Sequence, residues 1–167
     1  MVCSNSKNGF MTTIWGPMMW HFLHIISLNF PNNPTKKQKY QYYSFIVDLT
    51  NILPCNKCRD NLLSNLKSMK FDIDVHMQNR DTFAKFIYDL HNVVNLMLDK
   101  KKSNIDFKSV CDTYEIFRAK CDYSDIDGHE GCINPFIRNM AKSTCTFTII
   151  PSNIKQKSIL FDKRCFD

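Results

Sequence analysis

The chain has 167 residues, of which 44% are hydrophobic and 23% charged, so we expect a folded domain with a core and not a disordered chain. Its net charge of +6 comes from scattered lysines without a long basic stripe, which argues against nucleic acid as a partner. Glycine (4) and proline (6) are too scarce for an all-β fold with many turns, and this scarcity favours helices.

The amino-terminal segment shows no sign of a secretion signal or a membrane span. The first fourteen residues lack a basic region followed by a continuous apolar run. The most apolar stretch, 14–28, is interrupted by polar residues and is too short to cross a bilayer. Without a signal, the eight cysteines indicate redox or metal chemistry and not the disulfide framework of a secreted protein.

Hydrophobic periodicity and helix-start signals predict four amphipathic helices and a shorter fifth. Pro17 suits the first turn of a helix, and Thr35 with Gln38 three residues later forms a capping box. Pro54 interrupts the second helix, so the third is expected to begin at Cys55. We expect helices at about residues 17–28, 35–53, 55–66, 81–99 and 107–120, and an irregular connection over 68–80.

Amphipathic helices with short connections pack best as a bundle. The expected fold class is therefore all-α, a four-helix bundle with a short fifth helix. After Cys121 the sequence becomes acidic and turn-rich, and residues 146–150 are expected to form a short strand. This change in composition predicts a flexible arm over 1–13, a core domain over 14–120 and a cysteine-containing appendage over 121–167.

Cys55 and Cys58 form a C-x-x-C motif at a predicted helix start. Two cysteines at this spacing can close a disulfide, and a helix N-terminus lowers the pKa of a thiol, so the pair is easily oxidised and reduced. The alternatives are an inert pair, or half of a zinc site that folding completes with His21, His24 or His91. A thioredoxin-like site is disfavoured, because that fold needs strands around the motif and helices flank it here.

Two further residue pairs stand out by their helical spacing. Trp20 and His24 are four residues apart and share a face, so they either belong to a core cluster or bind a flat ring. His91 and Asn95 have the same spacing and interrupt an apolar stripe. A buried His or Asn needs hydrogen-bond partners, so these two either cap backbone groups or face a polar ligand. The basic run 100–102 is suited to an anionic group such as a pyrophosphate.

In chain order, these motifs resemble those of one family. The run W-G-P-M-M-W-H-F-L-H over 15–24 resembles the opening motif of the Erv/ALR FAD-linked sulfhydryl oxidases. L-P-C-N-K-C over 53–58 looks like the redox centre of that family, and L-H-N-V-V-N over 90–95 resembles its L-H-N-x-V-N signature. The likeness covers about residues 14–114, and the ordered combination is more specific than any one motif.

This resemblance implies a helical bundle that holds FAD, usually as a homodimer, and that forms disulfides in thiol-containing substrate proteins. Electrons would pass from a client or a redox relay protein through Cys55 and Cys58 to FAD and then to oxygen, giving hydrogen peroxide. Cys55 would exchange with the client, and Cys58 would lie nearer the flavin. By motif position the cofactor-binding residues are Gly16, Trp20, His24, His91, Asn92, Asn95, Lys100 and Tyr114, and no metal is expected.

The chain departs from the cellular members of this family at one disulfide. Many members have a cysteine three residues before the His of L-H-N, where this chain has Tyr88. The family disulfide that would include Cys111 therefore cannot form, and losing such a bond typically costs about 2–5 kcal/mol. In lacking this disulfide, the chain resembles the shorter enzymes of large DNA viruses. The setting expected from that resemblance is the host cytoplasm or the virion.

The remaining cysteines have two interpretations. Either they form structural disulfides within the appendage (the staple interpretation), or they form a mobile shuttle pair of the kind that family members carry. None forms a second C-x-x-C; they are Cys3, Cys121, Cys132, Cys145 and Cys165. Two other functions stay open on the residues alone, a zinc-binding interaction module and a purely structural helical adaptor. Each would make the three ordered motifs a coincidence.

Overall fold

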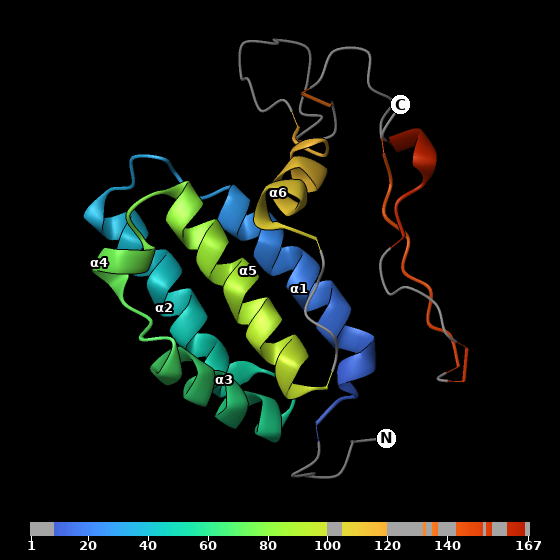
Figure 1. Cartoon of the computed structure of the whole chain (residues 1–167), viewed down its shortest axis with the longest axis horizontal. Helices are drawn as coiled ribbons and strands as arrows, with labels where there is room; N and C mark the ends of the chain where they lie inside the picture. Colours follow the sequence, from blue (N-terminus) through green and yellow to red (C-terminus); the bar gives the residue numbers. More distant parts are fainter. Residues whose placement is uncertain are drawn as a thin grey trace. The chain divides into compact units, whose positions relative to one another are not determined.

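The computed structural model describes residues 9–99, 105–119, 132, 135–136, 143–151, 153–154 and 160–165 (Figure 1). The chain divides into two compact units, Met1–Asn104 and Ile105–Asp167. The helices of the first unit are α1 Thr12–Leu28, α2 Lys36–Ile52, α3 Asn56–Ser68, α4 Ile73–His76 and α5 Arg80–Met97. Those of the second are α6 Phe107–Glu115 and a 3-10 turn, Lys163–Cys165.

The prediction of an all-α fold is confirmed. Across the described segments the chain forms helices and no strand, and one isolated antiparallel bridge joins Ala119 and Pro135. The strand predicted over 146–150 is wrong, because no described segment pairs with that backbone. No helix in the described part of the chain is long and apolar enough to cross a membrane.

Side-chain caps explain where several helices begin. The predicted capping box at Thr35 is present, since its side chain accepts from the Gln38 amide and Gln38 bonds back to the Thr35 amide. Asn79 and Thr82 form the same arrangement at the start of α5. Cys55 caps α3 through its sulfur, which accepts from the Cys58 amide. The redox motif therefore also defines the start of its helix.

The core of the first unit lies between its four longer helices. α1 packs along α5 and α2 along α3, while α4 contacts both α5 and α2 (Figure 1). Phe30 meets Tyr42 and Phe83 edge to ring, and all three belong to the core or pack against it. Ile46 and Ile87 are also fully buried. Burial of side chains of this size stabilises a fold by about 1.5–3 kcal/mol each.

α1 begins at Thr12 and not near Pro17, so the predicted start of this helix is wrong. A proline inside a helix removes one donor, which leaves the Thr13 carbonyl without its usual partner. Thr13 is exposed, and water can therefore satisfy that carbonyl. The Trp15 indole donates to the Phe10 carbonyl at 3.1 Å and so holds the turn that precedes the proline.

Two other predicted boundaries change. The connection predicted as irregular over 68–80 contains α4, whose first turn is capped by Asp72 through bonds to the Asp74 and Val75 amides. The fifth predicted helix ends at Glu115 and not near residue 120. The division into units falls after Asn104, and the proposed domain boundary at 120 stays a prediction.

Candidate active site

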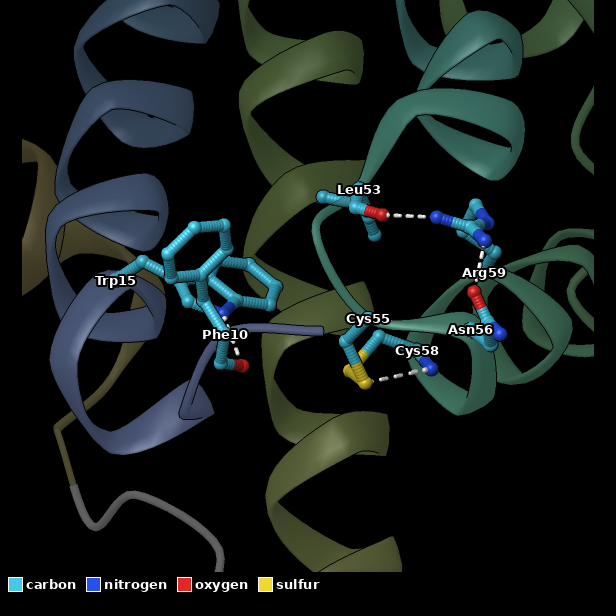
Figure 2. Close-up of a disulfide and its surroundings, with 7 residues drawn as sticks. All are labelled: Phe10, Trp15, Leu53, Cys55, Asn56, Cys58 and Arg59. Atoms are coloured by element: carbon cyan, nitrogen blue, oxygen red, sulfur yellow. Dashed lines mark hydrogen bonds between the residues drawn. A yellow bond between two sulfur atoms is a disulfide. The ribbon is translucent and has the colours of Figure 1, made fainter. Parts of the chain in front are cut away.

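The two cysteines of the C-x-x-C motif form a disulfide at the start of α3. The Cα atoms of Cys55 and Cys58 lie 5.2 Å apart, and the Cys55 sulfur accepts from the Cys58 amide at 3.2 Å (Figure 2). Both side chains are partly accessible. A disulfide at a helix N-terminus favours the thiolate that its opening releases, because the helix dipole and free amides stabilise negative charge there.

Arg59 holds the loop that leads into this disulfide. Its guanidinium donates to the Leu53 carbonyl at 2.6 Å and also to the Asn56 side chain (Figure 2). The Cys55 amide donates to the same Leu53 carbonyl at 2.8 Å. The Leu53 carbonyl therefore joins Arg59 and the Cys55 amide across Pro54, and no motif of the sequence marks Arg59.

On the other side of the disulfide lies the short segment Gly9–Phe10. The Phe10 amide donates to the Pro54 carbonyl at 2.7 Å, and the Phe10 carbonyl accepts from the Trp15 indole (Figure 2). These residues belong to the segment predicted as a flexible arm. No local pattern marks them, because their partner is the backbone of Pro54, more than forty residues away.

A second group of predicted residues gathers between α1 and α5. The rings of Trp20 and His91 stack with centroids 4.2 Å apart and planes 8° from parallel. His24 Nε2 lies 3.1 Å from His91 Nδ1, so one imidazole donates to the other. His21 is only partly buried.

Burial, followed by the neighbouring imidazoles of His91 and His21, lowers the pKa of His24 to about 4. Burial also lowers the pKa of His21. His24 is therefore neutral near pH 7, with one ring nitrogen that accepts and one that donates. A neutral His24 beside an indole is suited to a flat, uncharged heteroaromatic ring.

The α5 residues next to His91 add hydrogen-bonding capacity. Asn92 is buried, and its side-chain nitrogen has no hydrogen-bond partner within the part of the chain that the structure describes. A buried side-chain amide without a partner is a group that a polar ligand could satisfy. Asn95 is half-buried one turn further on, and a Cβ added at Gly16 would meet nothing within 4 Å. Together these residues fit a flat cofactor with polar edges.

Two predicted cofactor residues stay predictions. Lys100 lies outside the described residues. Tyr114 belongs to α6 in the second unit, where burial raises its pKa to about 12. The structure thus brings together Trp20 and His24 of α1 with His91 of α5, and Asn92 follows His91 on α5.

The described cysteines of the second unit do not pair with one another. Cys132 and Cys145 are exposed free thiols and Cys165 is a half-buried one, while Cys3 and Cys121 lie outside the described residues. The staple interpretation is therefore wrong for any pairing among Cys132, Cys145 and Cys165. In the described ranges no three His, Cys, Asp or Glu side chains gather in an arrangement that holds a metal ion.

Comparison with known proteins identifies the family. The sequence model of the Erv1 / Alr family matches residues 17–115, which is more than half of the chain and contains the disulfide and the aromatic cluster. The chain belongs to the Erv1 / Alr family. The matched region of this Erv1 / Alr chain includes both the disulfide of α3 and the group formed by Trp20, His24 and His91.

Viral proteins are among its relatives. The chain is 38% identical over 87 residues to a probable FAD-linked sulfhydryl oxidase of Acanthamoeba polyphaga mimivirus, covering 52% of this chain and 60% of that relative. It is 31% identical over 107 residues to the FAD-linked sulfhydryl oxidase of African swine fever virus, covering 60% of this chain and 87% of the relative. The match thus leaves out over a third of the mimivirus protein's length.

The fold is also that of a solved structure. The yeast Erv1 core superposes with a TM-score of 0.53 at 23% identity, covering 68% of this chain and 89% of the yeast one. At this identity the likeness shows the fold alone. It agrees with the helical bundle described above.

Proposed function

We propose that this chain is an FAD-dependent thiol oxidase that forms disulfide bonds in other proteins. One observation carries the proposal: a partly accessible C-x-x-C disulfide caps α3 within the region that matches the Erv1 / Alr family. The names of the mimivirus and swine fever virus relatives support both the FAD and the sulfhydryl substrate. Neither a zinc module nor a structural adaptor accounts for a closed redox pair in that position.

The reaction begins with thiol–disulfide exchange at Cys55. A client thiolate attacks the Cys55 sulfur, the Cys55–Cys58 bond breaks, and Cys58 leaves as a thiolate. A second client thiolate then attacks the client sulfur of this mixed disulfide, which forms the client's disulfide and releases Cys55 as a thiolate that takes up a proton. The client is oxidised by two electrons, and the pair at α3 is reduced by two.

The chain stabilises the leaving sulfur at Cys58. Cys58 lies in the first turn of α3, where the helix dipole favours a negative charge. Arg59 keeps the preceding loop in place through Leu53, so the two sulfurs stay close when the bond opens. The role of the protein in this step is placement and thiolate stabilisation.

Trp20, His24, His91, Asn92 and Asn95 would hold the FAD, with Gly16 leaving room beside them. The Trp20–His91 stack offers flat faces, and neutral His24 and the unpaired Asn92 amide offer an acceptor and a donor. Lys100 and Tyr114 are proposed as further cofactor contacts on the resemblance alone. Bound FAD supplies the acceptor for the electron pair of the dithiol, with oxygen as the final acceptor and hydrogen peroxide as product.

Reduced substrate proteins, or a relay protein that carries their electrons, are the proposed partners, and a homodimer is the proposed assembly. One face of α1 supports the dimer, since Met18, Phe22 and Ile25 are exposed at helical spacing and the helix carries no charged residue. Sedimentation at micromolar concentration should give the mass of two chains, and Phe22→Asp should give one. A wild-type monomer would contradict the dimer and leave the oxidase proposal intact.

The test of the function is a visible absorption spectrum before and after anaerobic dithiothreitol. We expect a flavin band that bleaches with the dithiol and returns with air. A flavin band that does not bleach would separate the cysteines from the cofactor and contradict the electron path. Absence of a flavin band after FAD is added would overturn the proposal.

A further inference from the structure

The Gly9–Phe10 segment lies directly against the peptide that precedes the reactive disulfide. A Cβ added at Gly9 would lie 2.1 Å from the Pro54 oxygen and 2.7 Å from the Cys55 Cα. Both neighbours are backbone atoms that cannot move aside, so no side chain fits here unless the segment shifts. The close approach therefore requires glycine at this position.

The backbone of Phe10 is held from both sides. Its amide donates to the Pro54 carbonyl at 2.7 Å, and its carbonyl accepts from the Trp15 indole at 3.1 Å. The first bond ties the segment to the redox loop and the second ties it to α1. Figure 2 shows Phe10 and Trp15 next to the disulfide, across from Leu53 and Arg59.

The side chain of Phe10 is not used in this anchoring. It is 79% exposed, and the next residue, Met11, is 68% exposed. Residues 9–14 carry no charge. An exposed aromatic side chain is thus fixed by backbone bonds one residue from the point where Gly9 touches Cys55.

A client cysteine must reach the Cys55 sulfur, so the residues beside that cysteine must pass close to the Pro54–Cys55 peptide. Phe10 lies at that peptide. An apolar side chain next to the client cysteine would cover part of the Phe10 ring and remove both surfaces from water. A polar neighbour, or a small dithiol with no neighbours, gains nothing there.

We propose that Phe10, held in place by Gly9 and Trp15, is a specificity-determining residue of the exchange site that favours polypeptide dithiols with apolar residues beside the reacting cysteine. This inference rests on the proposed oxidase function and names its substrate class. The chemistry of exchange is unchanged, and the contribution of Phe10 is confined to how tightly the client is held at Cys55.

The test uses two reduced C-x-x-C peptides of equal length and charge, flanked by leucine in one and serine in the other. Peroxide formation gives kcat/KM for each peptide and for dithiothreitol. The wild type should prefer the leucine peptide by about five-fold, which corresponds to about 40 Å² of apolar surface removed from water. Phe10→Ala should lose that preference, mainly through KM, while Phe10→Leu keeps most of it.

Two further variants separate this role from general damage. Tyr40→Ala removes another exposed aromatic side chain, 65% exposed and about three turns of α2 before its end, and should keep the preference. Gly9→Val should lose it although the ring remains, because the segment no longer fits against Pro54. Equal use of both peptides by the wild type, or an unchanged preference in Phe10→Ala, would overturn the inference. Turnover of dithiothreitol by the wild type tests the oxidase proposal independently.

Discussion

His24 on α1 and His91 on α5 are joined by a hydrogen bond of 3.1 Å between Nε2 of the first and Nδ1 of the second, although 67 residues separate them. The bond fixes the register of the two helices at the proposed cofactor site. It also restricts their protonation, since both rings cannot be cations at this distance without strong repulsion. At most one of the two imidazoles can therefore be charged, and the lowered pKa of His24 keeps that ring neutral near pH 7.

This arrangement makes the stability of the fold sensitive to acid. The pKa of His24 is lowered to about 4 in the folded chain, chiefly by burial, against an ordinary value of 6.5. The unfolded chain therefore binds more protons as pH falls below 6.5, and stability declines from there until about pH 4. By pH 5.0 the loss should be about 2 kcal/mol relative to pH 7.5.

Urea unfolding of the wild type and of His24→Gln, without added FAD, measures this loss. Glutamine does not titrate, so the variant should be less stable at pH 7.5 but should lose clearly less between pH 7.5 and 5.0. An equal acid-induced loss in both proteins would mean that other groups cause it.

Asn92 and Asn65 provide a matched pair for testing the cofactor site. Both are buried and both have a side-chain nitrogen without a partner among the described residues, but Asn92 lies beside His91 and Asn65 lies on α3. Asn92→Leu should weaken FAD binding at least about ten-fold, the usual cost of a lost hydrogen bond in a buried site. Because the substitution removes an unsatisfied amide, the unfolding free energy without FAD should change little.

Titration of FAD, followed by flavin fluorescence, gives the affinity of each variant. Asn65→Leu is the control and should bind FAD as the wild type does. If both variants lose affinity equally, the effect comes from the fold and not from a contact between Asn92 and the cofactor.

Much of the first unit could be predicted from periodicity and caps. The spacing of Trp20 and His24 placed them on one face of a helix, and the structure shows that face against His91. The capping box at Thr35 could also be predicted from the sequence, because Gln38 lies within one helical turn of it. Features of this kind depend on residues three or four apart, and for that reason sequence reasoning finds them.

The features that were missed depend on contacts between distant segments. Gly9 is explained only by the Pro54 backbone, and the helical turn before Pro17 is held partly by the bond from Trp15 to Phe10. α4 is too short for any hydrophobic period to appear, and its partners lie on α2 and α5. Local patterns carry no information about such partners, so these elements follow only from the tertiary structure.

The packing of α5 gives a prediction for stability. Ile87 is fully buried in the core, whereas Ile52 at the end of α2 is 65% exposed. Ile87→Ala should lower the unfolding free energy by about 2–5 kcal/mol, since it removes apolar contacts and leaves a cavity. Ile52→Ala should change it by less than about 0.5 kcal/mol. Chemical unfolding checks both values, and a similar loss in the two variants would contradict the described core.

The two sulfurs of the disulfide should not tolerate replacement. Cys58→Ser leaves Cys55 without a partner, so no disulfide can form to receive the client's electrons, and turnover of dithiothreitol should be abolished. FAD should remain bound, because none of the proposed cofactor residues lies on α3. Cys145→Ser removes an exposed thiol of the second unit and should keep full turnover with dithiothreitol. A Cys58→Ser protein that still oxidises dithiothreitol at the wild-type rate would show that electrons reach the flavin by another route.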